Sequence, residues 1–164
     1  MPDIYIFSAY SGTGKTTYLE RLIPCLKERG LRVAVVKHDV HGLALDREGK
    51  DSRRFARVGA DAVAVVSGGE CLLAEPRPLE LSDVLGYLPP ADIVLVEGFR
   101  QAPYPKIALY RKEAGQPLSA EAAECAAVVT DTPLEMDCPQ FPLDAPELLA
   151  AHLAGAVQRG AARG

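Results

Sequence analysis

The sequence predicts an α/β domain in which a mostly parallel sheet lies between layers of helices. Two observations support this prediction. Segments with strand character alternate along the chain with segments whose apolar residues recur at helical spacing. In addition, the short runs at residues 4–7 and 92–97 have continuously apolar interiors, which is typical of parallel strands buried on both faces. In such a sheet, ligands collect at the carboxyl ends of the strands.

Several predicted elements are bounded by residues that stop or turn the chain. Gly30 ends the first helix, Gly68 and Gly69 turn a hairpin, and Pro89 and Pro90 end a later helix. Residues 37–52 lack periodicity and are too long for an ordinary connection, so we expect a functional loop there, and residues 160–164 should fray. The complete set comprises strands at 4–7, 32–37, 61–67, 70–74, 92–97, 106–111 and 126–130, and helices at 15–29, 52–58, 79–88 and 146–157.

Length and charge limit the class of protein. The 164 residues suit one domain, residues 1–164, and the net charge of −4 argues against a nucleic-acid partner, which normally requires a basic surface. No apolar run approaches the roughly 20 residues that cross a bilayer, and the first apolar segment runs directly into a glycine-rich loop. We therefore expect no membrane span, no signal peptide and a cytoplasmic location.

Four scattered cysteines, Cys25, Cys71, Cys125 and Cys138, form no C-x-x-C pair. Zinc sites and disulfide frameworks need tighter spacing or a secreted context. We expect reduced thiols, mostly buried.

A phosphate-binding loop is predicted at residues 9–17, Ala-Tyr-Ser-Gly-Thr-Gly-Lys-Thr-Thr. The run matches the P-loop pattern G-x-x-x-x-G-K-[ST] except for alanine at the first glycine, and it stands between a strand and a helix as that motif requires. Backbone N–H groups and the helix amino terminus attract phosphate, and Gly12 and Gly14 leave room for it. Lys15 should reach the β- and γ-phosphates, Thr16 should bind Mg²⁺, and Thr17 should support the loop or the α-phosphate.

Other polar residues follow predicted strands at the same edge. Glu97 ends a Walker B-like strand, where a carboxylate holds a water on Mg²⁺ or orients the attacking water. Asp131 has two interpretations: a contact with N1–H and the 2-amino group of guanine, which would select GTP, or an ordinary turn before Pro133. Lys37 and His38 end a third strand. The glycine-rich loop and the segments that carry Glu97, Asp131 and Lys37-His38 are therefore all predicted to lie at the carboxyl edge of the sheet.

Several further residues keep more than one interpretation. His38 and His41 have a spacing that suits two metal ligands. They could also contact a phosphate or a substrate, or be ordinary polar residues of a loop. The remaining candidates are Asp39, Asp46 and Asp51 for water-mediated Mg²⁺ binding, Lys50, Arg53, Arg54 and Arg57 as a solvated helix face or an anion contact, and Arg100 and Lys106 as anion ligands.

These motifs together resemble the MobB family of molybdopterin-guanine dinucleotide biosynthesis adapter proteins. The likeness covers about residues 4–133 and is carried by the P-loop with Lys37-His38-x-x-His41, Gly49-Lys50-Asp51-Ser52, Val96-Glu97-Gly98-Phe99 and Pro105-Lys106-Ile107. It implies a P-loop NTPase domain, a GTP-binding homodimer with weak Mg²⁺-dependent GTPase activity, and assistance to the molybdenum cofactor guanylyltransferase or to molybdopterin-handling proteins.

The resemblance also assigns residues. Triphosphate binding falls to Ser11, Gly12, Thr13, Gly14, Lys15, Thr16 and Thr17, Mg²⁺ to Thr16 and Glu97, catalysis to Lys15 and Glu97, and guanine to Asp131. Lys37, His38, Lys50, Asp51 and Lys106 would face an anionic molybdopterin-like ligand or a partner. The sequence leaves open two other functions: a small-molecule kinase with a lid at residues 47–57, and a metal-delivery GTPase that uses His38 and His41.

Overall fold

The computed structural model describes residues 1–38, 51–119 and 125–162. The chain divides into two compact units, residues 1–38 with 85–164 and residues 39–84. The prediction of a single domain over residues 1–164 stays a prediction.

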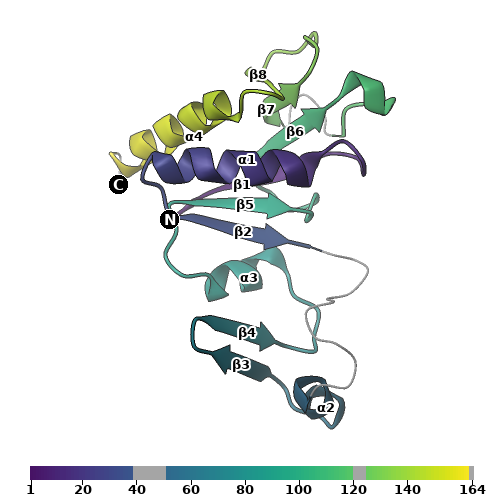
Figure 1. Cartoon of the computed structure of the whole chain (residues 1–164), viewed down its shortest axis with the longest axis vertical. Helices are drawn as coiled ribbons and strands as arrows, with labels where there is room; N and C mark the ends of the chain where they lie inside the picture. The colour runs from purple at the N-terminus through teal and green to yellow at the C-terminus, as the bar shows by residue number, and fades with distance from the viewer. Residues whose placement is uncertain (39–50, 120–124, 163–164) are drawn as a thin grey trace. The chain divides into compact units, whose positions relative to one another are not determined.

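A parallel six-stranded sheet forms the centre of the larger unit among the described residues (Figure 1). Its order is β2-β5-β1-β6-β7-β8, and every neighbouring pair is parallel. All six carboxyl ends therefore lie at one edge. The strands are β1 (Asp3–Ser8), β2 (Val33–Lys37), β5 (Ile93–Glu97), β6 (Lys106–Tyr110), β7 (Cys125–Thr130) and β8 (Gln140–Pro142).

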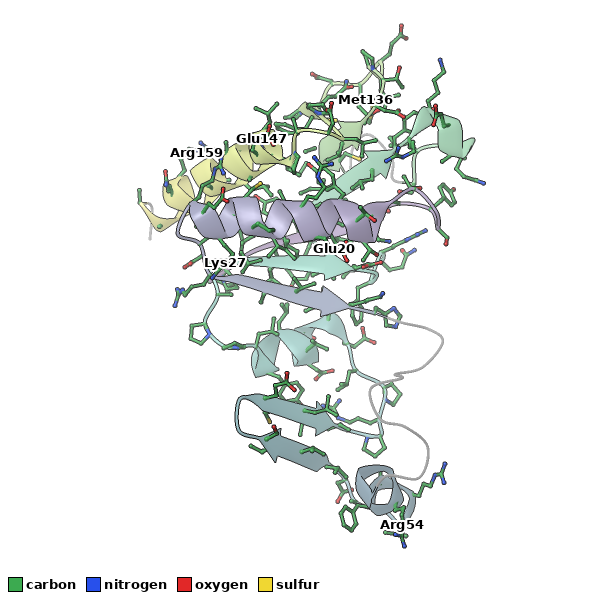
Figure 2. The ribbon with its side chains drawn as sticks, viewed as in Figure 1. Glu20, Lys27, Arg54, Met136, Glu147 and Arg159 are labelled. Carbon is green, nitrogen blue, oxygen red and sulfur yellow. The ribbon has the colours of Figure 1, made fainter. Side chains whose placement is uncertain are left out.

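Helices α1 (Lys15–Glu28) and α4 (Pro146–Ala161) pack on one face of this sheet. Alternate strand residues point to that face, because side chains alternate along a strand. Glu20 and Lys27 lie on the exposed side of α1 (Figure 2). The fully buried core between helices and sheet includes Phe7, Leu22, Leu26, Ile93, Leu95, Ile107, Val129 and Leu149.

The opposite sheet face is buried as well. Ile6, Val96 and Val128 are each 0% exposed. The hydroxyl of Ser8, on the same face as Ile6, lies 2.9 Å from that of Ser119, which places the segment after β6 over this face. Burial on both faces explains the continuously apolar strands.

An ion pair fixes the start of two strands at the other edge. Asp92 accepts hydrogen bonds from the backbone N–H of Arg32 at 2.7 Å and from its guanidinium at 2.7 and 3.1 Å. These bonds lower the pKa of Asp92 to about 2. They tie the entry of β2 to that of β5.

The smaller unit contains α2 (Asp51–Arg57) and an antiparallel hairpin of β3 (Val63–Ser67) and β4 (Glu70–Ala74). Gly68 and Gly69 form its turn, as predicted. Arg54 lies on α2 (Figure 2). Helix α3 (Leu81–Tyr87) crosses the boundary between the units. Several large apolar side chains of this unit are exposed, namely Phe55, Val58, Val65, Val66 and Leu73.

The structure confirms the predicted fold class, a mostly parallel sheet flanked by helices, and every predicted strand and helix exists within a few residues of its expected bounds. Two short elements were missed: β8, which is three residues long and ends in proline, and the 3₁₀ turn η1 (Lys112–Ala114). Helix α4 also continues to Ala161, past its predicted end at Val157. In the described part of the chain, no helix is both long and apolar enough to span a bilayer.

The prediction for the cysteines is partly wrong. None of the four, all within the described residues, forms a disulfide, but none is buried either. Cys71 is exposed because it lies on a two-stranded hairpin. The other three are partly buried, at the flank of α1, the start of β7 and a loop.

Two adjacent leucines of α4 test the packing of this helix. Leu149 is 0% exposed and Leu148 is 49% exposed. We expect Leu149→Ala to lower the free energy of unfolding by about 2–5 kcal/mol, because it leaves a cavity against α1 and the sheet. Leu148→Ala should change it by less than about 0.5 kcal/mol. Urea unfolding followed by circular dichroism measures both, and equal losses would contradict the packing.

Candidate functional site

The loop between β1 and α1 has a backbone shape that glycine makes possible. Gly12 has a φ of 83° and Gly14, the residue that caps α1, a φ of 91°. Thr13 closes the loop, since its hydroxyl and its N–H both donate to the carbonyl of Tyr10, at 2.9 and 3.3 Å. Helix α1 begins directly afterwards. The loop thus presents the amino terminus of a 14-residue helix, an arrangement that favours anions.

Ala9, which stands where the P-loop pattern has its first glycine, is buried. Its side chain is 1% exposed and belongs to the core beneath α1. The methyl group therefore adds buried apolar surface to this core.

Lys15 and Glu97 meet at the carboxyl edge. The register of β1 and β5 sets Phe7 beside Glu97, and the Nζ of Lys15 lies 3.4 Å from Oε1 of Glu97. Both side chains are about one-sixth exposed, at 15% and 16%. Thr16 and Thr17 are exposed in the first turn of α1. The structure thus brings the predicted lysine and the predicted carboxylate together.

The segment after β5 links two neighbouring strand ends. Gly98 has a φ of 97°, and a Cβ atom there would lie 2.6 Å from Cβ of His38. The N–H of His38 donates to the carbonyl of Glu97 at 2.8 Å. The rings of His38 and Phe99 stack with centroids 4.5 Å apart, and Phe99 itself has a positive φ of 48°.

Arg100 continues this segment to the phosphate loop. Its Nη2 donates to the carbonyl of Ala9 at 2.6 Å, and its guanidinium lies 6.0 Å from the ring centroid of Tyr10. We expected Arg100 as an anion ligand, and the structure gives it a contact with the loop backbone. Residues 97–100 thereby connect the end of β2 with the loop after β1.

A second part of the site lies at the ends of β7 and β8. Asp131 is exposed and its Oδ1 accepts a hydrogen bond from the N–H of Lys112 at 3.0 Å. Arg21 of α1 donates to the carbonyls of Leu143 and Asp144 at 3.3 and 2.6 Å. A cavity of about 440 Å³ is lined by Arg21, Arg111, Thr130, Asp131, Pro142, Leu143 and Asp144.

Sequence reasoning missed Arg21 and Arg111. Nε of Arg111 lies 3.4 Å from the carbonyl oxygen of Thr13, so the residue after β6 touches the phosphate loop. Arg21 resembles an ordinary surface residue of a helix. The one available signal was that Arg111 immediately follows a strand that ends at the ligand edge.

The remaining candidates are distributed unevenly. Lys37 and His38 are exposed at the carboxyl edge, whereas Lys106 begins β6 and pairs with Ile6, one residue below the level of Glu97. Arg54 and Arg57 belong to the smaller unit. Within the described residues, no group of three His, Cys, Asp or Glu side chains is arranged to hold a metal. Asp39, His41, Asp46 and Lys50, and the side chains of Asp51 and Arg53, lie outside what the structure describes.

Strand order and loop together define the class of protein: a parallel sheet with a glycine-rich loop between its first strand and first helix is the P-loop NTPase fold. Residues 4–131 match the family model described as "MobB: Molybdopterin guanine dinucleotide synthesis protein B". The chain belongs to the MobB family.

Relatives and solved structures agree with this assignment. The chain is 43% identical over 136 residues, 79% of its length and 75% of the relative's, to the molybdopterin-guanine dinucleotide biosynthesis adapter protein of Haemophilus influenzae. It is 37% identical to the protein of that name from Escherichia coli, over 84% of this chain and 83% of the other. The crystal structure of Bacillus subtilis MobB has a TM-score of 0.69 and 30% identity, covering 94% of this chain and 97% of that one.

The close approach at Gly98 can be tested with a matched glycine. We expect Gly98→Ala to lower the free energy of unfolding by about 3 kcal/mol. The cost of a left-handed backbone at a residue with a side chain adds to the cost of placing its Cβ 2.6 Å from Cβ of His38. Gly115→Ala should cost about 1 kcal/mol, since Gly115 has a φ of 63° but open space around it. Thermal unfolding of both variants measures the difference, and equal costs would show that the contact with His38 relaxes freely.

Proposed function

We propose that this protein is a GTP- and Mg²⁺-dependent adapter in molybdopterin-guanine dinucleotide biosynthesis, with slow GTPase activity. The observation that supports it most directly is the pairing of Lys15 with Glu97 at the mouth of a glycine-rich loop. The names of the relatives from Haemophilus influenzae and Escherichia coli supply the pathway.

Residues of the loop, of the start of α1 and of the end of β5 each bind a different part of the nucleotide and its metal ion. The backbone of Ser11, Gly12, Thr13 and Gly14 receives the phosphates, with Thr17 in support, and Lys15 binds the β- and γ-phosphates. The hydroxyl of Thr16 and the carboxylate of Glu97 would hold Mg²⁺, which would supply positive charge against the charge that develops on the phosphates. Lys15 and Glu97 contact each other in this structure and would separate to bind the phosphates and the metal. Glu97 also orients the attacking water.

Guanine is the base that suits Asp131. Asp131 borders the cavity beside the loop, and its Oδ1 is held in place by the N–H of Lys112. A carboxylate accepts hydrogen bonds from both N1–H and the 2-amino group of guanine, and adenine offers neither donor in that arrangement. The base choice therefore favours GTP over ATP.

Partner binding completes the adapter role. The exposed Lys37 and His38 offer positive and polar groups to an anionic molybdopterin-like ligand or to the guanylyltransferase that uses it. Val66 and Leu73 of the β3–β4 hairpin are 74% and 46% exposed, and an isolated hairpin is at best marginally stable, so we propose that this unit forms a homodimer contact. A monomer in sedimentation equilibrium would exclude the dimer. The cytoplasm is the proposed location.

Loss of the loop lysine tests the triphosphate site. We expect Lys15→Ala to weaken GTP binding by about 100-fold, because it removes charge-assisted hydrogen bonds. Lys27→Ala provides the matched control, since Lys27 lies on the same helix, far from the loop, and is exposed. Isothermal titration calorimetry with GTP and Mg²⁺ gives both affinities. Unchanged binding by the Lys15 variant would refute the proposed site.

The base contact has a separate test. We expect Asp131→Asn to reduce GTP affinity at least about tenfold and to raise affinity for xanthosine triphosphate, because an amide donates to the 2-carbonyl group of xanthine. Asp144→Asn, in the same cavity, should leave the preference unchanged. Competition between the two nucleotides reports the ratio, and a constant ratio in the Asp131 variant would place the base elsewhere.

A further inference from the structure

Arg111 lies where the phosphate loop meets the cavity of Asp131. It follows β6, the strand next to β1, and its Nε is 3.4 Å from the carbonyl oxygen of Thr13. A Cβ atom placed on Gly14 would be 3.6 Å from its Nη2. The same side chain lines the cavity that contains Thr130 and Asp131. One guanidinium therefore touches the loop backbone and borders the cavity.

The hydrogen-bonding capacity of Arg111 is largely unused. A guanidinium carries five N–H donors, and in the described residues Arg111 makes one long hydrogen bond and no ion pair. Arg21 and Arg100 differ, because each donates at 2.6 Å to a backbone carbonyl and so has a structural role. The contact of Arg111 with Thr13 is weak enough to be exchanged for a stronger one.

The position of this cation selects one part of a nucleotide. If the β- and γ-phosphates lie against the loop and Lys15, and the base lies beside Asp131, the groups between them are the ribose and the α-phosphate, of which only the α-phosphate is an anion. Phosphate oxygens are the acceptors that a planar guanidinium binds best, through two parallel hydrogen bonds.

We propose that Arg111 leaves the carbonyl of Thr13 and binds the α-phosphate of the nucleotide, so that it positions the triphosphate and the base relative to each other. The inference rests on the proposed function. Because every nucleotide from the monophosphate upward has an α-phosphate, Arg111 acts equally on GDP and GTP, unlike a ligand of the γ-phosphate.

Affinities of GDP and GTP for Arg111→Ala test the proposal. We expect both to fall by the same factor, about 10–100-fold, with the GDP to GTP ratio unchanged. Lys112→Ala is the matched control, because Lys112 is the exposed neighbour and uses only its backbone N–H toward Asp131. A loss confined to GTP would assign Arg111 to the γ-phosphate, and no loss would assign it to the loop alone. Either result overturns the proposal.

A thio-substituted nucleotide locates the contact without relying on folding of the alanine variant. The wild-type protein should bind GDP more tightly than one diastereomer of GDPαS, because sulfur accepts a hydrogen bond poorly. Arg111→Lys keeps the positive charge but loses the two parallel N–H donors of the guanidinium. It should reduce that discrimination severalfold while leaving the discrimination against GDPβS intact. Equal discrimination in both proteins would refute the α-phosphate contact. If the wild-type protein binds no guanine nucleotide, the proposed function itself fails; if it prefers adenine, ADP and ADPαS replace the probes.

Discussion

Parallel pairing of β1 with β5 is the constraint on which the carboxyl edge of the sheet depends. It places Phe7 beside Glu97, so the loop that leaves β1 and the carboxylate that ends β5 start from the same level. β2 continues that level with Lys37 on the other side of β5. Because side chains alternate along a strand, a slip of one residue would turn Glu97 to the opposite face and away from Lys15.

The shape of the phosphate loop depends on residues that follow three other strands of the sheet as well as on its own glycines. Arg100, after β5, donates to the carbonyl of Ala9 at the start of the loop, and Arg111, after β6, contacts the carbonyl of Thr13 near its end. His38, after β2, limits the space at Gly98 and so fixes the segment that carries Arg100. The site is therefore a property of the sheet edge, assembled from residues about 90 positions apart in the chain.

The parts of the structure that could be predicted are those that local patterns encode. Continuously apolar runs identified β1 and β5, and glycine and lysine at fixed spacing identified the loop. β8 could not be found this way, because a strand of three residues that follows one proline and ends in another carries no periodicity. Arg111 and Arg21 were missed because their contacts join segments far apart in sequence, and the burial of cysteines was overestimated because thiol burial depends on which layer covers each position. Glu97 could be predicted to lie at the carboxyl edge, where the structure places it, because a carboxylate at the end of a strand is a local signal.

The pairing of Lys15 with Glu97 has a consequence for selectivity among anions. Lys15 and Glu97 place one positive and one negative charge 3.4 Å apart at this edge, so the pair carries little net attraction for a bare anion. A metal-free phosphate chain that took Lys15 would leave the carboxylate facing like charge. On the proposed function, a metal-complexed chain would supply a cation for the carboxylate at the same moment, so this ion pair would favour a metal-complexed nucleotide over free inorganic phosphate and uncomplexed nucleotides.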